Sequence, residues 1–477
     1  MSTTTESQAL RGGVLNVRHL VFFVVAAAAP LTTIGGFAPL AFSMGGQSSP
    51  VGYLIAGLVY GLFAVGFCAM SRYVKSGAFS AYIGHGLGHR MGGGAAVVAW
   101  LGYTTGQIGF CAAAGLFASH ALGSLAGVEV NWPICAAVIA LGTAYVSYCR
   151  VDLGAKLLAL LLFGEIGILI LLAVAIILKG GPEGFSLEGF NPGNWSMSAM
   201  GSLFIITFVV YIGFEQTAVY AEESKDPIRT VPRATYVAVI LLAALYTVLS
   251  WVLLMAIGPS SLSSFLTTGD PSMMVINLNE KYLGSFMSNV MQVLIVTSFI
   301  AGVLALQNAG ARYLFNMGRD GIVSNVFART SQGNGTPKVA VFTQGTLVFL
   351  ATVAFGMSSL DPYSQLVVWM NTPTLVGVLG LQVLTSIAVI RFFAKCPGEV
   401  SRWHSVIAPG LAVLSLGAVL ILICCKMDLL TGLDTTGNLL VNIPLLLAFA
   451  FGFYRAHLLG ASSTAGLDPS LPSVSKV

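Results

Sequence analysis

Twelve apolar runs of about twenty residues divide the sequence, and they constrain its fold more than any other feature. A helix of about 20 apolar residues is long enough to cross the hydrocarbon core of a bilayer. Charged residues make up only 8% of the chain, against about 25% in soluble proteins, and most of them lie between the runs. We therefore expect an all-α polytopic membrane protein with 12 transmembrane helices. The expected spans are residues 19–45, 50–70, 93–121, 131–149, 155–178, 198–221, 233–257, 285–315, 339–357, 363–391, 404–425 and 437–456.

The basic residues predict which side of the membrane each loop faces. If the N-terminus is cytoplasmic, 19 of the 22 Lys and Arg residues fall on the cytoplasmic side, and only Lys179, Lys281 and Lys426 fall on the other. The positive-inside rule then predicts that both termini are cytoplasmic, in a cell membrane that we expect to be bacterial. This asymmetry also accounts for the net charge of +4, so we expect no nucleic-acid partner.

The segments outside the spans are short. We expect residues 1–18 to be a polar cytoplasmic tail and not a cleavable signal peptide, because the first apolar run is too long and others follow it. Residues 461–477 are rich in Ser and Pro and predict a disordered cytoplasmic tail. The cysteines and histidines lack metal-ligand spacing and no nucleotide-binding loop is present. We therefore expect no metal, no cofactor and no enzymatic activity.

Spans one and six contain residues that interrupt a helix. Two prolines bracket Thr32–Gly36 in span one, and Gly213 precedes Glu215 in span six. These spans begin two sets of five, so an odd number of crossings inverts the second set. Inverted repeats with matching broken helices indicate a binding site at the bilayer midplane. The expected units are a first repeat over residues 19–178, a second over 198–391, and two further helices over 404–456.

A broken helix offers a site for a zwitterion. Its free backbone groups must face protein or water, because lipid cannot pair with them. The N-terminal end of a half-helix suits a carboxylate, and the carbonyls of the opposite half suit an ammonium group. The alternative for Gly35 and Gly36 is close packing between helices, in which small residues are common.

Glu165 and Glu215 are the acidic residues expected well inside spans. A carboxylate in hydrocarbon costs about 2.5–3.5 kcal/mol on insertion scales, so such residues usually line a pathway or site. A buried carboxyl group can titrate near neutral pH, as a proton carrier must. Both are therefore candidate proton-coupling residues, with Glu215 the first choice. The alternative is a protonated glutamate bonded permanently to a neighbouring helix.

Three ordered motifs resemble those of amino-acid permeases of the amino acid–polyamine–organocation superfamily. The most specific is Gly213-Phe214-Glu215 followed by residues 222–234, EESKDPIRTVPRA. The second is residues 311–321, ARYLFNMGRDG, and the third is residues 76–82, SGAFSAY. The resemblance covers nearly the whole chain. It implies a five-plus-five inverted repeat of the leucine-transporter type that works by alternating access.

The resemblance also implies a substrate site at the two breaks. Backbone amides of an unwound Thr32–Gly36 stretch would bind the substrate carboxylate, and carbonyls near Ile212 and Gly213 would receive its amino group. Side chains of span six would border the substrate's R group. The implied substrate-binding residues are Thr32, Thr33, Ile34, Gly35, Gly36, Val209, Tyr211, Ile212, Gly213 and Phe214.

The sequence departs from the family pattern at three places. The first break reads Thr-Ile-Gly-Gly instead of the common Gly-Ser-Gly type. Val209 occupies the position of an aromatic gate in some relatives, which leaves Phe208, Tyr211 or Phe214 as alternative gates. Glu165 aligns with a lysine that replaces a sodium ion in several proton-coupled relatives, so a lysine mechanism is not expected here.

Charges of opposite sign lie at the cytoplasmic ends of spans six and eight. Arg312 and Arg319 are candidates for ion pairs with Glu222, Glu223 or Asp226 that close the inward path. The alternative is the ordinary basic charge of a cytoplasmic loop.

Four polar residues inside spans could contribute to a binding site or only to the structure of the helices. Thr297 and Ser298 would be sodium ligands, or they would bond the preceding helical turn, which is the usual arrangement. Gln107 and Asn308 would reach the cavity, or they would pack between helices.

The sequence as a whole predicts a secondary transporter that imports an amino acid, coupled to protons more readily than to sodium. Within the transporter class, the alternatives are an exchanger and a polyamine or amine transporter with Glu165 or Glu215 as counter-charge. From another class, a channel or a substrate sensor would retain the same fold.

Overall fold

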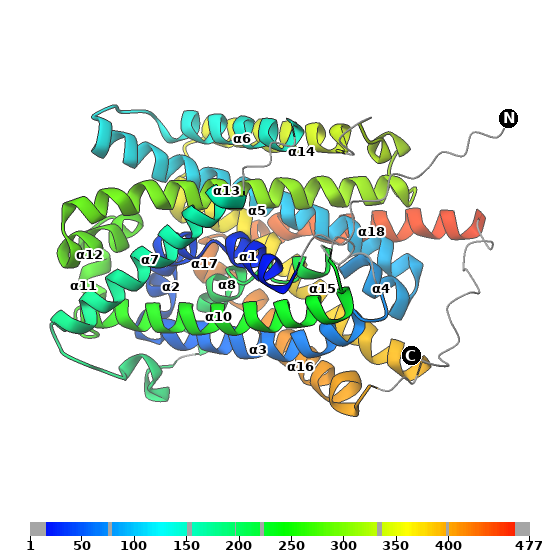
Figure 1. The fold of residues 1–477 in the computed structure, drawn as a ribbon, viewed down its shortest axis with the longest axis horizontal. Helices are drawn as coiled ribbons and strands as arrows, with labels where there is room; N and C mark the ends of the chain where they lie inside the picture. Colours follow the sequence, from blue (N-terminus) through cyan, green and yellow to red (C-terminus); the bar gives the residue numbers. More distant parts are fainter. Residues whose placement is uncertain are drawn as a thin grey trace.

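The computed structural model describes residues 16–74, 79–149, 155–195, 197–219, 224–331, 336–396 and 400–462. Long helices run along its longest axis (Figure 1). Its helices are α1 (Val17–Ala28), η1 (Thr32–Phe37), α2 (Ala38–Gly45), η2 (Gly46–Ser48), α3 (Ser49–Met70), α4 (Phe79–Leu87), α5 (His89–Ala126), α6 (Trp132–Cys149), α7 (Ala155–Lys179), η3 (Glu188–Phe190), η4 (Pro192–Asn194), α8 (Met197–Val209), α9 (Gln216–Val219), α10 (Pro227–Ile257), α11 (Leu262–Thr268), η6 (Pro271–Met273), α12 (Met274–Leu283), α13 (Ser285–Arg319), η7 (Asn325–Ala328), α14 (Lys338–Gly356), η8 (Pro362–Val367), α15 (Val368–Lys395), η9 (Trp403–Ile407), α16 (Ala408–Cys425), α17 (Met427–Thr431) and α18 (Thr435–Ser462).

Ten helical stretches of the described residues are long and apolar enough to cross a membrane. They include expected spans two to five and seven to twelve, so the chain is an all-α polytopic membrane protein. Spans one and six are the two that do not run as continuous helices. Span one is divided into α1, η1 and α2, and span six into α8 and α9. Twelve crossings therefore remain a prediction, with two of them made from helical pieces.

Packing between the spans repeats with an offset of five. Contact between α1 and α10 (spans one and seven) is matched by contact between α8 and α3 (spans six and two). Contact between α5 and α15 is matched in the same way by contact between α13 and α7. Figure 1 shows α6 beside α14 at the top and α3 beside α10 at the bottom. This is the pairing that two repeats of five spans would make, although the repeat boundaries stay a prediction.

The last two long helices pack on the outside of this arrangement. Helix α18 lies against α5 and α15, and α16 lies against α3 and α15. Close approach of α18 depends on small residues, since a Cβ on Gly93 would lie 2.8 Å from the carbonyl oxygen of Gly452. Arg455 on α18 donates to the carbonyl oxygens of Ile322 (3.1 Å) and Gly321 (3.3 Å). Helix α18 is thereby joined to the segment that follows α13.

Candidate functional site

Span one is interrupted between Ala28 and Ala38, but its backbone is not unwound there. Ala29 has a positive φ of 44°, and Thr32–Phe37 then form the π-helix η1, all of it buried. The Ala38 N–H bonds the Thr33 carbonyl, the five-residue spacing of a π-helix. The expectation of an unwound Thr32–Gly36 stretch is therefore wrong in this respect. A wider helical turn accommodates the segment between the two prolines while it retains backbone hydrogen bonds.

A chain of hydrogen bonds joins η1 to α13 and α7. The Thr32 N–H and Thr32 Oγ1 both donate to Ser298 Oγ, at 3.2 and 2.9 Å. Ser298 Oγ in turn donates to Glu165 Oε2 at 2.8 Å. Glu165 is 4% exposed, and the backbone of Leu31 also bonds its carboxyl group. Two residues predicted separately, Glu165 and Ser298, thus meet at the span-one break, whereas the neighbouring Thr297 hydroxyl bonds the preceding turn at Leu294.

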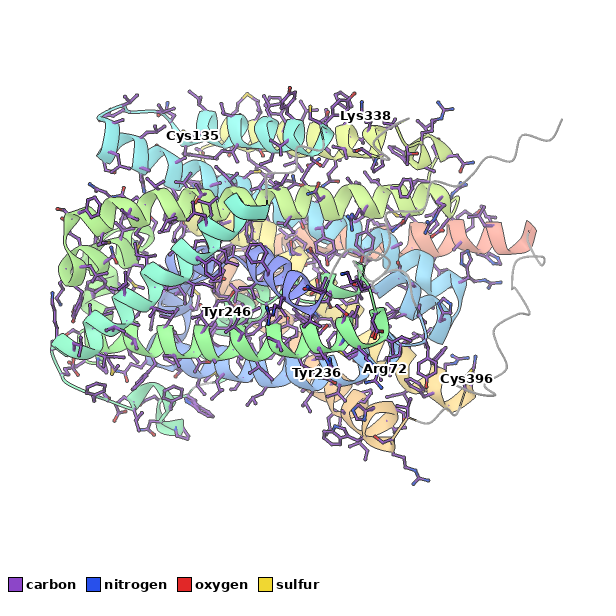
Figure 2. The ribbon with its side chains drawn as sticks, in the orientation of Figure 1. Arg72, Cys135, Tyr236, Tyr246, Lys338 and Cys396 are labelled. Atoms are coloured by element: carbon purple, nitrogen blue, oxygen red, sulfur yellow. The ribbon has the colours of Figure 1, made fainter. Side chains whose placement is uncertain are left out.

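Two buried tyrosine hydroxyls bond carbonyls at the ends of the same break. Tyr246 on α10 donates to the Ala28 carbonyl oxygen at 3.1 Å and accepts from Thr33 Oγ1 at 3.3 Å. Tyr363 in η8 donates to the Gly36 carbonyl oxygen at 2.6 Å. Figure 2 shows Tyr246 beside α1 near the middle of the molecule. The sequence analysis missed both residues. Their only signal was a tyrosine in an apolar run, whose buried hydroxyl needs a partner.

Span six breaks completely between Val209 and Gln216, where α8 ends and α9 begins. Gly213 in this segment has φ of 122°, which side chains with a Cβ rarely adopt. The carboxyl group of the fully buried Glu215 accepts from the Gly213 N–H (2.9 Å) and from the Tyr103 hydroxyl (2.6 Å). Glu215, which was predicted from its place in the motif, therefore bonds the backbone of the break directly.

The two interrupted spans are neighbours and run in opposite directions. Helix α2 packs against α8, and α1 packs against α9. The second half of span one thus meets the first half of span six, and the first half of span one meets the second half of span six. This pairing brings the predicted substrate residues Thr32–Gly36 and Tyr211–Phe214 to the same level of the bundle. Every one of them is buried except Ile212, which is half-buried.

The aromatic residues proposed as alternatives to Val209 are packed into the core beside span two. The Phe208 carbonyl accepts from the Tyr60 hydroxyl at 3.0 Å, and the Phe214 ring lies 5.2 Å from the Tyr60 ring. The Tyr211 hydroxyl donates to the Tyr53 carbonyl at 2.9 Å. The ring that covers the span-one break comes from α13 instead, because Phe299 lies so close to Gly36 that a Cβ there would meet its Cζ at 2.5 Å.

The polar residues of spans three and eight pack between helices. Gln107 donates to Gln307 Oε1 at 2.8 Å and accepts from Gln344 Nε2 at 2.9 Å, which joins α5, α13 and α14. Asn308 accepts from Ser147 Oγ at 2.6 Å. Both residues therefore have the packing arrangement that the sequence left as an alternative.

The structure describes only some of the residues of the predicted gating pairs. Glu222 and Glu223 lie outside the described residues. Arg319 is exposed, with its guanidinium 6.0 Å from the centre of the Phe315 ring. Asp226, the residue before α10, pairs at 3.8 Å with Arg229 on that helix. The gating role of Arg312 and Arg319 stays a prediction.

Residues 15–451 match the amino acid permease family. The chain belongs to this family. It is 25% identical over 283 residues to the branched-chain amino acid permease BcaP of Bacillus subtilis (strain 168), a match that covers 56% of this chain and 54% of that protein. It is 27% identical over 372 residues to the human cationic amino acid transporter 4, covering 73% of this chain and 54% of that protein.

The chain also resembles a relative whose name gives a different solute. The methylthioribose transporter of Bacillus subtilis (strain 168) is 27% identical over 308 residues, covering 62% of this chain and 60% of that protein. The chain thus spans about half the length of the curated relatives it matches. The chain is therefore a multi-pass membrane protein of the amino acid permease family.

Proposed function

We propose that this permease imports an amino acid by alternating access, with the solute held between the interrupted spans one and six. The observation that carries the proposal is the antiparallel packing of α1 and α2 against α9 and α8. It places two buried helix breaks at one level, where backbone dipoles of opposite sign are available. A zwitterion is the solute class that uses both signs.

The two breaks have different roles in this proposal. The π-helical turn of Thr32–Gly36 would open so that its N–H groups bind the carboxylate, and carbonyls near Ile212 and Gly213 receive the ammonium group. Glu215 holds the second break open, since its carboxyl group accepts from the Gly213 N–H. It acts as a positioning residue there, and the Tyr103 bond orients it.

Glu165 is the better placed of the two acids for proton coupling. A serine hydroxyl has one proton to donate and two lone pairs. Ser298 accepts twice from Thr32 and donates once to Glu165, so its bonding capacity is filled. If a protonated Glu165 donated to Ser298, the hydroxyl bond between Ser298 and Thr32 would have to reverse or break, since Ser298 can accept only two hydrogen bonds. The proton on Glu165 is thereby linked to the hydrogen bonds of span one, whose conformation must change during transport.

A transporter of cationic amines is the second candidate, because two buried carboxyl groups lie at the breaks. Glu215 serves this alternative poorly, since its carboxyl group already bonds Gly213 and Tyr103. Only Glu165 would then be available as a counter-charge. The named solutes of the relatives include branched-chain and cationic amino acids, so both classes belong in the same assay.

The test is uptake into proteoliposomes with an imposed inward proton gradient. Leucine, lysine, arginine and putrescine are compared in the unsubstituted protein, Glu165→Gln and the control Glu280→Gln, whose side chain is exposed on α12. Accumulation of an amino acid that collapses with the gradient, and that loses this dependence only in Glu165→Gln, supports the proposal. Uptake driven only by internal solute indicates an exchanger. Saturable binding without uptake indicates a sensor.

A further inference from the structure

A cavity of about 470 Å³ opens at one end of the molecule. His120, Glu129 and Asn131 line it on one side, and Asp270 and Met273 on the other. This end carries α11 and α12, opposite the end with α4 and Arg72 (Figures 1 and 2). The distribution of basic residues predicts that it faces away from the cytoplasm.

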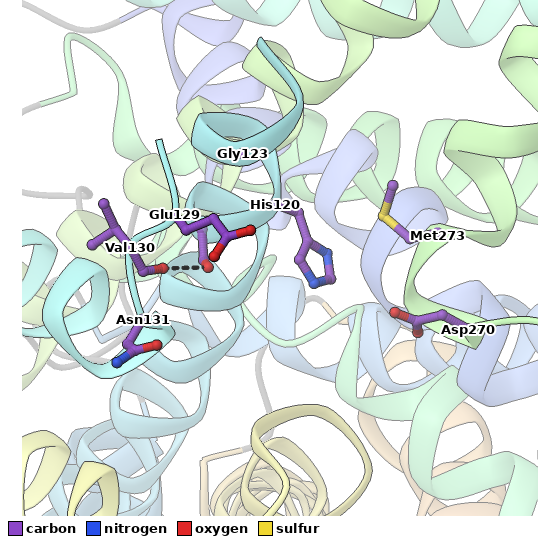
Figure 3. Close-up of a pocket in the computed structure, with 8 residues that line it drawn as sticks. His120, Gly123, Glu129, Val130, Asn131, Asp270 and Met273 are labelled. Carbon is purple, nitrogen blue, oxygen red and sulfur yellow. Dashed lines mark hydrogen bonds between the residues drawn. The ribbon is translucent and has the colours of Figure 1, made fainter. Parts of the chain in front are cut away.

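The acidic side chains reach the cavity from two separate connections. Glu129 lies between α5 and α6, in a segment anchored where Ser119 Oγ donates to the Val130 carbonyl oxygen at 2.5 Å. Asp270 precedes η6, and its Oδ1 accepts from the N–H and the hydroxyl of Ser272, both at 2.8 Å. Figure 3 shows the imidazole of His120 between the two carboxylates. The helix-capping role of Asp270 uses one oxygen and does not require a negative charge.

Two of the elements that line the cavity, α5 and η6, also reach the span-one break. Segment η6 packs directly against η1. Phe117 lies one helical turn before His120, stacks on Phe299 with ring centres 5.2 Å apart, and meets the Tyr363 ring at 6.4 Å. Phe299 and Tyr363 both lie against Gly36. One layer of aromatic rings therefore separates the cavity from the proposed substrate site.

The charges that line the cavity favour a cation. Its lining includes two carboxylates and a histidine, and no lysine or arginine from the part of the chain that the structure describes. His120 Nδ1 is buried without a hydrogen-bond partner among the described residues. A hollow surface with charge of one sign raises the local concentration of an opposite charge, over a range of about 8 Å at physiological ionic strength.

We propose that this cavity is an outer waiting site, which holds the ammonium group of an arriving amino acid or amine between Glu129 and Asp270 before the aromatic layer opens. The proposal rests on the proposed function for the direction of entry, but the site itself can be tested without transport. It predicts that the solute must carry an ammonium group, and that a neutral sugar would gain nothing from the two carboxylates.

The first test measures the charge preference of the cavity directly. Asn131→Cys is prepared in the full chain with the exposed Cys149, Cys396, Cys424 and Cys425 changed to serine. Its reaction rates with trimethylammonium-ethyl and sulfonato-ethyl methanethiosulfonate, corrected for their rates with a free thiol, give the preference. We expect the cation to be favoured by about tenfold or more. The preference should vanish in Glu129→Gln/Asp270→Asn, which retains the cap on Ser272, and should persist in Glu280→Gln. An equal preference before and after removal of the two carboxylates overturns the proposal.

The second test measures uptake kinetics in the same variants. Loss of the two carboxylates should raise the KM for lysine and leucine about three- to tenfold at low ionic strength, with kcat unchanged and a smaller effect at high salt. A KM that does not change while uptake continues overturns the waiting site and leaves the proposed function intact. A chain that transports nothing, yet whose Asn131→Cys thiol is protected by lysine, overturns the proposed function and supports the site.

Discussion

The breaks in spans one and six are held in place by contacts of different range. The span-one break keeps a helical backbone, and its polar contacts come from Ser298, Tyr246 and Tyr363, which are more than 200 residues away in the chain. The span-six break loses its helix, and Glu215 there bonds Gly213 only two residues away as well as the distant Tyr103 hydroxyl. The polar contacts at the first break thus come mainly from distant residues, whereas the second break combines distant contacts with a bond inside its own sequence.

This difference indicates how the two breaks can contribute to a transport cycle. Contacts between helices must be broken and remade when one bundle rocks against another, so span one is the part whose conformation such a motion changes. A break stabilised by its own neighbouring residues travels as a unit. We therefore expect substitutions at span six to affect folding first, and substitutions around span one to affect the coupling and rate of transport first.

Glu215→Ala should give the largest effect. The Gly213 N–H and the Tyr103 hydroxyl would remain buried without an acceptor, at a cost of about 1–3 kcal/mol each. We expect a clear fall in Tm in detergent and loss of uptake, with Glu215→Gln intermediate because its amide offers one acceptor oxygen. An unchanged Tm would show that the span-six break does not depend on its own acid.

Gly213→Ala should give the next largest effect. A side chain at a φ of 122° is strained, which costs on the order of 1–3 kcal/mol. Gly61→Ala on α3 is the matched control, since its φ is ordinary and open space surrounds it. The measurement is thermal unfolding of both variants. Equal Tm values would mean that the break tolerates another backbone conformation.

Ser298→Ala should change transport more than stability. It disconnects Glu165 from Thr32. We expect the rate of uptake to fall about tenfold, which corresponds to about 1.4 kcal/mol of free energy, and to depend less on the proton gradient. Thr297→Ala is the control, because its hydroxyl bonds only the preceding turn. The readout is initial uptake at several external pH values. A parallel fall in both variants would contradict a specific link through Ser298.

Tyr363→Phe should give the smallest effect. It removes one hydrogen bond to the Gly36 carbonyl, worth about 0.5–1.5 kcal/mol. We expect a change of a few-fold in KM. Tyr53→Phe is the control, since the Tyr53 hydroxyl is buried without a hydrogen-bond partner among the described residues and its loss should be neutral. If Tyr53→Phe had the larger effect, the Gly36 bond would not be what fixes the span-one break.

Much of the fold could be predicted because its determinants are local. Length and hydropathy identify helices that cross a membrane, and the proline and glycine residues of spans one and six mark where those helices are interrupted. The motif around Gly213 and Glu215 placed an acid beside a break, and the structure shows the two bonded. A contact between residues two apart can be inferred from sequence because the chain itself holds them close.

The tertiary structure decided the features that depend on distant partners. From Pro30 and Gly35 the sequence could predict that span one is disturbed, but not that the stretch between them would wind as a π-helix. Tyr246, Tyr363 and Ser298 bond that helix, and a hydroxyl inside an apolar run does not reveal which distant group it will meet. Glu165 became part of the site only when α7 was placed against α13. Hydropathy and backbone preference are properties of a segment, whereas the pairing of buried polar groups is a property of how segments pack.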